Sequence, residues 1–190
     1  MVNKIIRCAW CGEDKGYQSY HDHEWGVACY DDKKLFEFLI LESAQAGLSW
    51  LTILRKRDNY RKAFADFEVE AVAQFGEAEI DRLINDQGIV RNQLKIKSSI
   101  TNARCYLDIQ AEMGSFSNYL WGFVYGRPIV NQWISEDQIP ISTDLSDKVS
   151  QDMKARGFKF FGTTICYAYL QAMGVVNDHV VSCFRHPANG

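Results

Sequence analysis

The sequence predicts an all-α fold, and three observations lead to this prediction. Apolar residues recur at helical spacing through most of the 190 residues. Glycines follow these periodic segments where helices are expected to end, and only three prolines occur. Valine, isoleucine and threonine show no sustained alternation with polar residues, so we expect little or no sheet.

The first long helix is expected between Asp31 and about Ala46. Asp31 and Asp32 are both good N-terminal caps, because a short acidic side chain can accept from the free N–H groups of the first turn. Leu35 and Phe38 fall on one side of this helix together with Ala46.

A second helix is expected from Trp50, because Gly47 interrupts the first and Ser49 can cap the next. Further helices are expected at residues 69–75, 77–86, 92–113, 115–125, 145–156 and 163–173. Glycines lie at or just beyond several helix ends, namely Gly88, Gly114, Gly157 and Gly174.

The composition is that of an ordinary globular protein, with 47% hydrophobic and 24% charged residues. The length suits one domain over residues 1–190, or two small lobes. No stretch approaches the roughly 20 apolar residues of a membrane span, and no secretory signal is visible. We therefore expect a cytoplasmic protein whose six cysteines are thiols or metal ligands. The net charge of −3 argues mildly against a strongly electrostatic nucleic-acid binder but allows a local basic face.

Cysteine and histidine residues at the two chain ends form a candidate metal site. Cys8 and His21 are separated by twelve residues, and His179 and Cys183 are four apart. On a helix, the latter two would share one face. Two thiolates and two imidazoles would make a closed tetrahedral set, which is typical of structural zinc. The alternative is that these are unrelated buried residues.

Glu42 is a candidate site residue because it follows Phe38 and Leu39 on the apolar side of its helix. A carboxylate is costly to bury there without partners, although Glu42 could instead lie at the wet edge of the apolar stripe. A dense group of aromatic residues accompanies it in the sequence. These rings could be core, or they could form a pocket for a flat, electron-poor ligand: Trp10, Tyr17, Tyr20, Trp25 and Trp50.

The connection at residues 86–91 is a candidate phosphate site. Gly88 permits a tight bend with positive φ, and N–H groups exposed at such a turn can hold a phosphate. An ordinary helix connection is the alternative.

The chain resembles the DNA-3-methyladenine glycosylase I family. The resemblance extends from residue 7 to residue 183 and is carried by four separated runs in the same order: YHDHEWG at 20–26, LESAQAGLSW at 41–50, GFKFFG at 157–162 and VNDH at 176–179. It implies an all-α helix-hairpin-helix DNA glycosylase fold, with the hairpin near residues 77–100.

The resemblance also implies a structural zinc that joins the N- and C-terminal segments. Its ligands would be Cys8, His21, His179 and Cys183. Cys11 and His23 are rival ligands, because each lies close to one of these residues in the sequence.

The base pocket implied by the resemblance contains Glu42 and Tyr20 as catalytic residues and Trp50 as the stacking residue. Tyr17, Trp10 and Trp25 would be neighbours in substrate binding. Residues at two turns would contact DNA: Gly88, Ile89, Val90 and Arg91 at the hairpin, which would hold backbone phosphate, and Gly47 and Leu48, which could form a wedge into the duplex.

The implied function is a monofunctional DNA glycosylase of base-excision repair. It would flip 3-methyladenine out of alkylated double-stranded DNA and hydrolyse the N-glycosidic bond. The products would be free 3-methyladenine and an abasic site, without strand cleavage. We expect a monomer with no membrane partner. The rival functions are a zinc-stapled binding module without turnover, a glycosylase for 7-methylguanine or hypoxanthine, and a helical adaptor.

Overall fold

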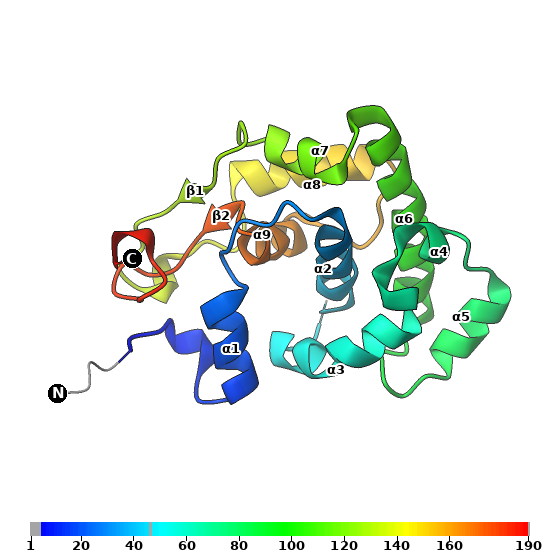
Figure 1. Cartoon of the computed structure of the whole chain (residues 1–190), viewed down its shortest axis with the longest axis horizontal. Coiled ribbons are helices and arrows are strands. Elements are labelled where there is room, and N and C mark those ends of the chain that lie inside the picture. The colour runs from blue at the N-terminus through cyan, green and yellow to red at the C-terminus, as the bar shows by residue number, and fades with distance from the viewer. Residues whose placement is uncertain (1–4, 46, 190) are drawn as a thin grey trace.

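The computed structural model describes residues 5–45 and 47–189, and within these ranges it is mainly helical, as predicted (Figure 1). The helices are α1 (Lys15–His23), α2 (Asp32–Gln45), α3 (Trp50–Ala63), α4 (Val69–Ala73), α5 (Glu77–Ile84), α6 (Gln93–Met113), α7 (Phe116–Gly122), α8 (Asp144–Ala155) and α9 (Thr163–Ala172). Two short strands, β1 (Ile129–Val130) and β2 (Val176–Asn177), form a parallel pair. Single 3₁₀ turns occur at Ala9–Cys11, Ala65–Phe67, Glu136–Gln138 and Pro187–Asn189.

Helix α2 is the centre of the molecule. It packs against α9, α6, α3 and α7, which surround it in Figure 1. Every residue from Leu35 to Ala44 is buried, so the helix is enclosed on all sides and has no exposed stripe along these residues. The wet-edge alternative for Glu42 is therefore wrong. The expected end of this helix at Ala46 lies outside the described residues.

N-terminal capping residues explain where the helices around the site begin. The Asp31 carboxylate accepts from Lys34 N at 2.7 Å at the start of α2, and Ser49 Oγ accepts from Thr52 N at 3.3 Å at the start of α3. Asp32, the other predicted cap, acts on a different helix. Its carboxylate accepts from the N–H groups of Phe116 and Ser117 at 2.8 Å each, and so joins α2 to the first turn of α7.

Helix α1 was not predicted, although it carries several site residues. Asp14 caps it by accepting from Tyr17 N at 2.9 Å. Gly16 in the first turn weakens the helical pattern at this point of the sequence. Arg55 on α3 donates to the other oxygen of Asp14 at 2.8 Å, which fixes the start of α1 against α3.

The segment after α9 is not the helix expected for His179 and Cys183. Residues 176–177 pair with β1, and Asp178 is completely buried. The chain then makes a tight turn in which Cys183 N donates to Val180 O at 2.8 Å. Because strand pairing and the burial of Asp178 hold the backbone extended, a turn brings the two ligand side chains together here.

The connection between α5 and α6 differs from the prediction in one respect. Gly88 is not among the glycines with positive φ, whereas Gly47, Gly114, Gly157 and Gly174 are. Glycine is required at position 88 for space, since a Cβ there would lie 2.9 Å from Asn59 Cβ on α3. The connection therefore packs closely against α3.

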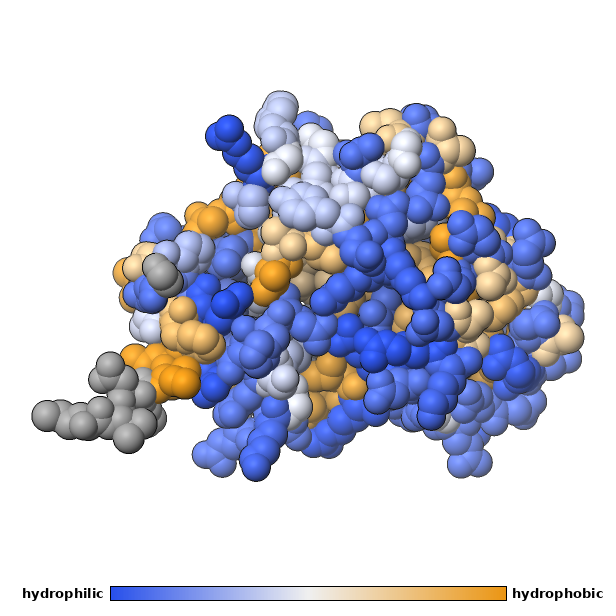
Figure 2. All heavy atoms as spheres, viewed as in Figure 1, coloured by the Kyte–Doolittle hydropathy of each residue, from blue (hydrophilic) through white to orange (hydrophobic). Residues whose placement is uncertain are grey.

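The buried apolar side chains form one cluster from Cys8 to Cys183. The division of residues 1–190 into one domain or two lobes stays a prediction. Hydrophilic side chains cover most of the face shown in Figure 2, including the edge along α1, α3 and the α5–α6 connection. In the part of the chain that the structure describes, no helix combines the length and apolar character needed to cross a membrane.

Candidate active site and metal centre

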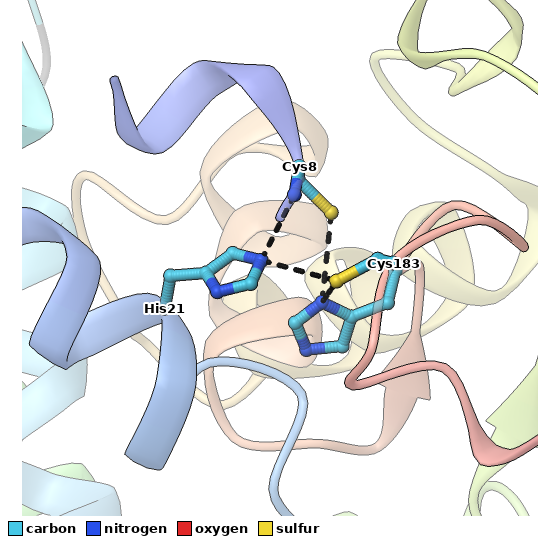
Figure 3. Close-up of side chains that lie close together, drawn as sticks. Cys8, His21 and Cys183 are labelled. Carbon is cyan, nitrogen blue, oxygen red and sulfur yellow. Dashed lines mark hydrogen bonds between the residues drawn. The ribbon is translucent and has the colours of Figure 1, made fainter. Parts of the chain in front are cut away.

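The four predicted metal ligands converge in the structure. Their ligand atoms all lie within 4.8 Å of one another, and all four residues are buried. Cys183 Sγ is 3.4 Å from His21 Nε2 and 3.5 Å from His179 Nδ1, and Cys8 Sγ is also 3.5 Å from His179 Nδ1 (Figure 3). Tetrahedral zinc bound by nitrogen and sulfur requires ligand separations of about 3.6 Å. The group can therefore hold a metal ion of this kind.

Hydrogen bonds on the outer side of the two rings turn one nitrogen of each toward the cluster, where His21 Nε2 accepts from Cys8 N at 3.2 Å. His21 Nδ1 donates to Asp22 Oδ1 at 2.8 Å, and His179 Nε2 donates to the carbonyl oxygen of Trp25 at 3.0 Å. The lone pairs of His21 Nε2 and His179 Nδ1 then face the cluster. Arg7 in turn donates to both oxygens of Asp22, to Oδ1 at 2.8 Å and to Oδ2 at 2.7 Å. Such outer partners fix ring orientation in metal sites.

Neither rival ligand belongs to the cluster. Cys11 Sγ donates to the carbonyl oxygen of Cys8 at 3.1 Å and is held there. His23 is exposed, and its Nδ1 lies 2.9 Å from the carbonyl oxygen of Ser19.

A cavity of about 340 Å³ opens beside the metal cluster. All six residues predicted for the base pocket line it: Trp10, Tyr17, Tyr20, Trp25, Glu42 and Trp50. These side chains come from the N-terminal segment, α1, α2 and α3, so the central helix and two peripheral ones meet at the cavity. Its volume lies at the small end of the range for ligand sites in proteins and suits a single flat ring system.

Glu42 is the buried acid of this cavity. Its side chain is only 3% exposed, and its Oε2 has no hydrogen-bond partner among the described residues. Burial raises the pKa of Glu42 to about 8. The indole Nε1 of Trp50 is likewise buried without a partner. Unmet polar atoms in a folded protein are unfavourable, and their concentration in one cavity indicates a ligand site.

The aromatic side chains form a connected wall from the cavity to the metal cluster. The Tyr20 ring lies 5.5 Å from that of Trp50, and the Trp10 ring lies 5.0 Å from that of Trp25. Trp25 also meets the His179 ring edge-on at 4.7 Å. Because Trp25 contacts His179 through both its ring and its carbonyl group, the metal cluster fixes the position of the cavity wall.

Five further residues line the cavity and were not predicted: Gln45, Glu136, Ile139, Ala168 and Gln171. Glu136 accepts from Trp10 N at 3.2 Å, which ties a distant 3₁₀ turn to the N-terminal wall. No sequence signal indicates this contact. Gln171 does carry a signal, because it is the single amide side chain on the otherwise largely apolar α9.

The predicted DNA-contacting residues lie outside the cavity. Leu48 is 41% exposed on the turn between α2 and α3, two residues from Trp50. In the α5–α6 connection, Gly88 N already donates to Asp86 Oδ1 at 2.7 Å, and Val90 N donates to Tyr60 Oη at 3.1 Å. Ile89 is buried. Arg91 is exposed, directly before the first turn of α6.

Known proteins are similar to this chain both in sequence and in fold. The family model of methyladenine glycosylases matches residues 10–186. The Escherichia coli K12 protein DNA-3-methyladenine glycosylase 1 is 49% identical over 183 residues, which are 96% of this chain and 98% of that protein. The chain belongs to the methyladenine glycosylase family.

Two solved structures of 3-methyladenine DNA glycosylase I extend the comparison to the fold. The Staphylococcus aureus protein gives a TM-score of 0.92 at 41% identity, covering 95% of this chain and 96% of that one. A variant in complex with 3-methyladenine gives 0.93 at 41% identity, covering 95% and 97%.

Membership of the methyladenine glycosylase family confirms the resemblance and the all-α glycosylase fold predicted from the sequence. The buried cluster confirms that a metal ion can be held at the predicted place. The identity of that ion, the helix-hairpin-helix motif and the roles of individual residues stay predictions.

Proposed function

We propose that this protein is a monofunctional DNA-3-methyladenine glycosylase that removes the flipped-out base from alkylated DNA and leaves an abasic site. The observation that carries the proposal is the buried, unpartnered carboxyl group of Glu42 in an aromatic cavity. The relatives named DNA-3-methyladenine glycosylase, and the solved complex of a relative with 3-methyladenine, support this choice of substrate.

The cavity side chains divide the work of base binding. Trp50 stacks on the base, and Tyr20 packs or hydrogen-bonds along the base edge. Glu42 accepts a hydrogen bond from the exocyclic amine, which favours adenine over 6-oxo purines. Trp10, Tyr17 and Trp25 complete the aromatic enclosure, and ring faces attract a cationic base.

The positive charge of the methylated base explains why its removal needs little acid catalysis. Adenine methylated at N3 is cationic while it is attached to the sugar, so it is already a good leaving group. The same cation lowers the pKa of a nearby carboxyl group, and the bound base therefore favours the ionised form of Glu42. The residues that line the cavity in the described chain include no lysine that could attack the sugar. We therefore expect hydrolysis without strand cleavage.

Two turns are proposed to contact the duplex. Leu48, presented by the positive-φ Gly47, would enter the gap left by the flipped base. At the proposed helix-hairpin-helix motif, the N–H groups of Gly88 and Val90 are already used within the protein. Arg91, beside the N-terminus of α6, is therefore the better phosphate ligand.

The metal is proposed to be zinc in a structural role. Cys8, His21, His179 and Cys183 would hold it, and two neighbouring buried thiolates require a cation for their charge. Four protein ligands leave no position for water or substrate, so zinc would contribute stability and rigidity only. A monomer and a cytoplasmic location also stay predictions.

The test is release of free base from methylated duplex DNA, with the released bases separated by chromatography. Wild-type protein should release 3-methyladenine, and Glu42→Gln should lose much of the rate or selectivity while keeping its fold. Glu70→Gln, an exposed residue on α4, is the matched control and should act as wild type. Release by Glu42→Gln at the wild-type rate and selectivity would show that Glu42 has no such role.

The same assay tests the rivals and the wedge. Tight binding of base without turnover would indicate the binding module, and release of only 7-methylguanine or hypoxanthine would indicate a different lesion. Leu48→Ala should slow excision from duplex DNA more than from single strands, because only the duplex has a stack to open. Met113→Ala, also 41% exposed but on the far end of α6, should change neither.

A further inference from the structure

The α9 wall of the cavity contains an amide group whose orientation is fixed. Gln171 lines the cavity, and its Nε2 donates to Asp178 Oδ2 at 2.7 Å. A carboxylate can only accept hydrogen bonds, so the atom of Gln171 facing Asp178 must be the nitrogen. The amide oxygen Oε1 consequently points away from Asp178, and it has no partner within the described chain.

Asp178 is itself immobilised, because it is completely buried and receives four hydrogen bonds. Asn131 Nδ2 and Trp133 Nε1 donate to Oδ1 at 2.6 and 2.7 Å, and Tyr167 Oη donates to Oδ2 beside Gln171. Turning the amide of Gln171 over would place two oxygen atoms against each other. It would also leave the buried Asp178 carboxylate short of one donor, which is unfavourable.

The ligand proposed for this cavity has a matching requirement. The exocyclic amine of adenine has two N–H groups, and Glu42 can accept from one of them. In a cavity that excludes water, the second N–H also needs an acceptor, or its desolvation is not compensated. Gln171 lines the cavity, and its Oε1 is not used by the bond to Asp178, so this oxygen can accept it.

Glu42 discriminates less strictly against a neutral 6-oxo purine such as hypoxanthine, which brings no cation to lower the pKa of this carboxyl group. Burial raises that pKa to about 8, so near neutral pH the carboxyl group can then donate to an oxo group as well as accept from an amine. The Gln171 amide has no such freedom, since Asp178 holds the nitrogen. An oxo group placed against Oε1 would meet only an acceptor.

We propose that Gln171 is a specificity-determining residue that accepts from the second N–H of the exocyclic amine, and that Asp178 is the positioning residue for its amide. This inference rests on the proposed glycosylase function. Glu42 and Gln171 together would discriminate amino purines from oxo purines. Of the two, only Gln171 on α9 is held by the protein as an acceptor.

The first experiment measures kcat/KM for release of 3-methyladenine and of 7-methylguanine from methylated duplex DNA. Gln171→Met keeps the length and volume of the side chain but removes the acceptor. The ratio of the two kcat/KM values should fall on the order of tenfold. Gln151→Met, at an exposed position on α8, is the matched control and should leave the ratio unchanged. An unchanged ratio in Gln171→Met would overturn the proposal.

Asp178→Asn tests the positioning role. The asparagine amide can donate to Oε1 and let Gln171 turn over, so the selectivity ratio should fall in the same direction as in Gln171→Met. A merely structural role would lower the melting temperature and leave the ratio unchanged, which would contradict the assignment. Zinc content is measured alongside, because His179 follows directly in the sequence.

A measurement on the wild-type protein does not depend on the folding of any variant. Binding of free 3-methyladenine is compared with binding of its N6-monomethyl derivative by quenching of tryptophan fluorescence. Because the derivative has one N–H, its affinity should be on the order of tenfold lower, and equal affinities would refute the two-acceptor assignment. Failure of wild-type protein to release any 3-methyladenine would instead refute the proposed function. Release with unchanged ratios in the variants would refute this inference alone.

Discussion

At the scale of single residues, the site can be identified from buried polar atoms that have no hydrogen-bond partner in the fold. Glu42 Oε2 and Trp50 Nε1 are buried without partners, whereas the buried Asp178 receives four hydrogen bonds. A completely paired carboxylate stabilises the structure around it. An unpaired one lowers stability in the free protein and becomes favourable only when a ligand supplies the missing donor.

The unfavourable burial of the Glu42 carboxylate predicts how the stability of the free protein depends on pH. The pKa of Glu42 rises from its ordinary value near 4.5 to about 8 on folding. Below about pH 4.5 the group is protonated in both states and has no effect. Between these two values the unfolded chain loses the proton and the folded protein keeps it, so stability falls as pH rises.

Glu42→Gln should therefore be more stable than wild type, by an amount that grows between pH 5 and pH 8 and then stays constant. Its upper limit is on the order of 5 kcal/mol, from about 1.4 kcal/mol for each pKa unit. Urea unfolding at several pH values measures the difference. Glu70→Gln should show no such growth, and a difference for Glu42→Gln that is independent of pH would mean that the carboxyl group is not desolvated.

The sequence predicts site residues well where unusual residue types cluster in neighbouring segments. Glu42 on an apolar helix and the aromatic residues around it could be found this way, because an acid on an apolar helix face and a dense group of rings are both unusual in a sequence. Glu136 could not be found, since its contact with Trp10 N joins segments more than a hundred residues apart. Nothing local marks a side chain whose role comes only from tertiary structure.

At the scale of elements, a cap was neither necessary nor sufficient for predicting a helix: α9 has no side-chain cap and was predicted, whereas α1 is capped by Asp14 and was not. Ser49 and Asp31 begin α3 and α2 as expected. Gly16 obscures the helical pattern of α1, and the ligand spacing at residues 179–183 fits a helix as well as the turn that the structure has. In that segment, strand pairing and the burial of Asp178 decide the backbone, and neither is visible in local spacing.

The α5–α6 connection shows how packing limits function within an element. Its N–H groups at Gly88 and Val90 are bound to Asp86 and Tyr60, and Lys56 on α3 donates to the carbonyl oxygens of Gln87 and Gly88. These bonds hold the connection rigidly against α3. Rigidity suits an element that must place one cation and one helix terminus against a DNA backbone.

Arg91→Ala is expected to weaken binding to duplex DNA about equally for all sequences. If Arg91 neutralises one phosphate, the slope of log K against log salt concentration should decrease by about 1. Lys154→Ala removes an exposed cation on α8, a helix on the opposite edge in Figure 1, and should leave the slope unchanged. Equal slopes for Arg91→Ala and wild type would mean that this connection does not lie against the phosphates.

At the scale of the whole molecule, the metal cluster joins the two ends of the chain to each other and to the cavity. Cys8 and His21 belong to the first segment, and His179 and Cys183 belong to the last. Other long-range bonds also hold the N-terminal wall, such as those of Glu136 to Trp10, Arg55 to Asp14 and Arg57 to Glu24, but these three do not reach residues 179–183. Loss of the metal should therefore loosen one wall of the cavity while the α2–α6 core stays packed.

Removal of the metal is the decisive measurement at this scale. Metal analysis of wild-type protein should give one zinc per chain, and Cys183→Ala should bind none and lose several kcal/mol of stability. Cys11→Ala is the matched control, because this thiol is equally buried beside the cluster but is not a ligand. It should retain one zinc and lose only about 1 kcal/mol of stability.

Hydrogen exchange should rise at residues 8–25 and 176–186 in Cys183→Ala, while α6 stays protected. Full zinc occupancy in Cys183→Ala, or wild-type protein of unchanged stability after chelation, would show that hydrogen bonds and packing alone hold the two ends together.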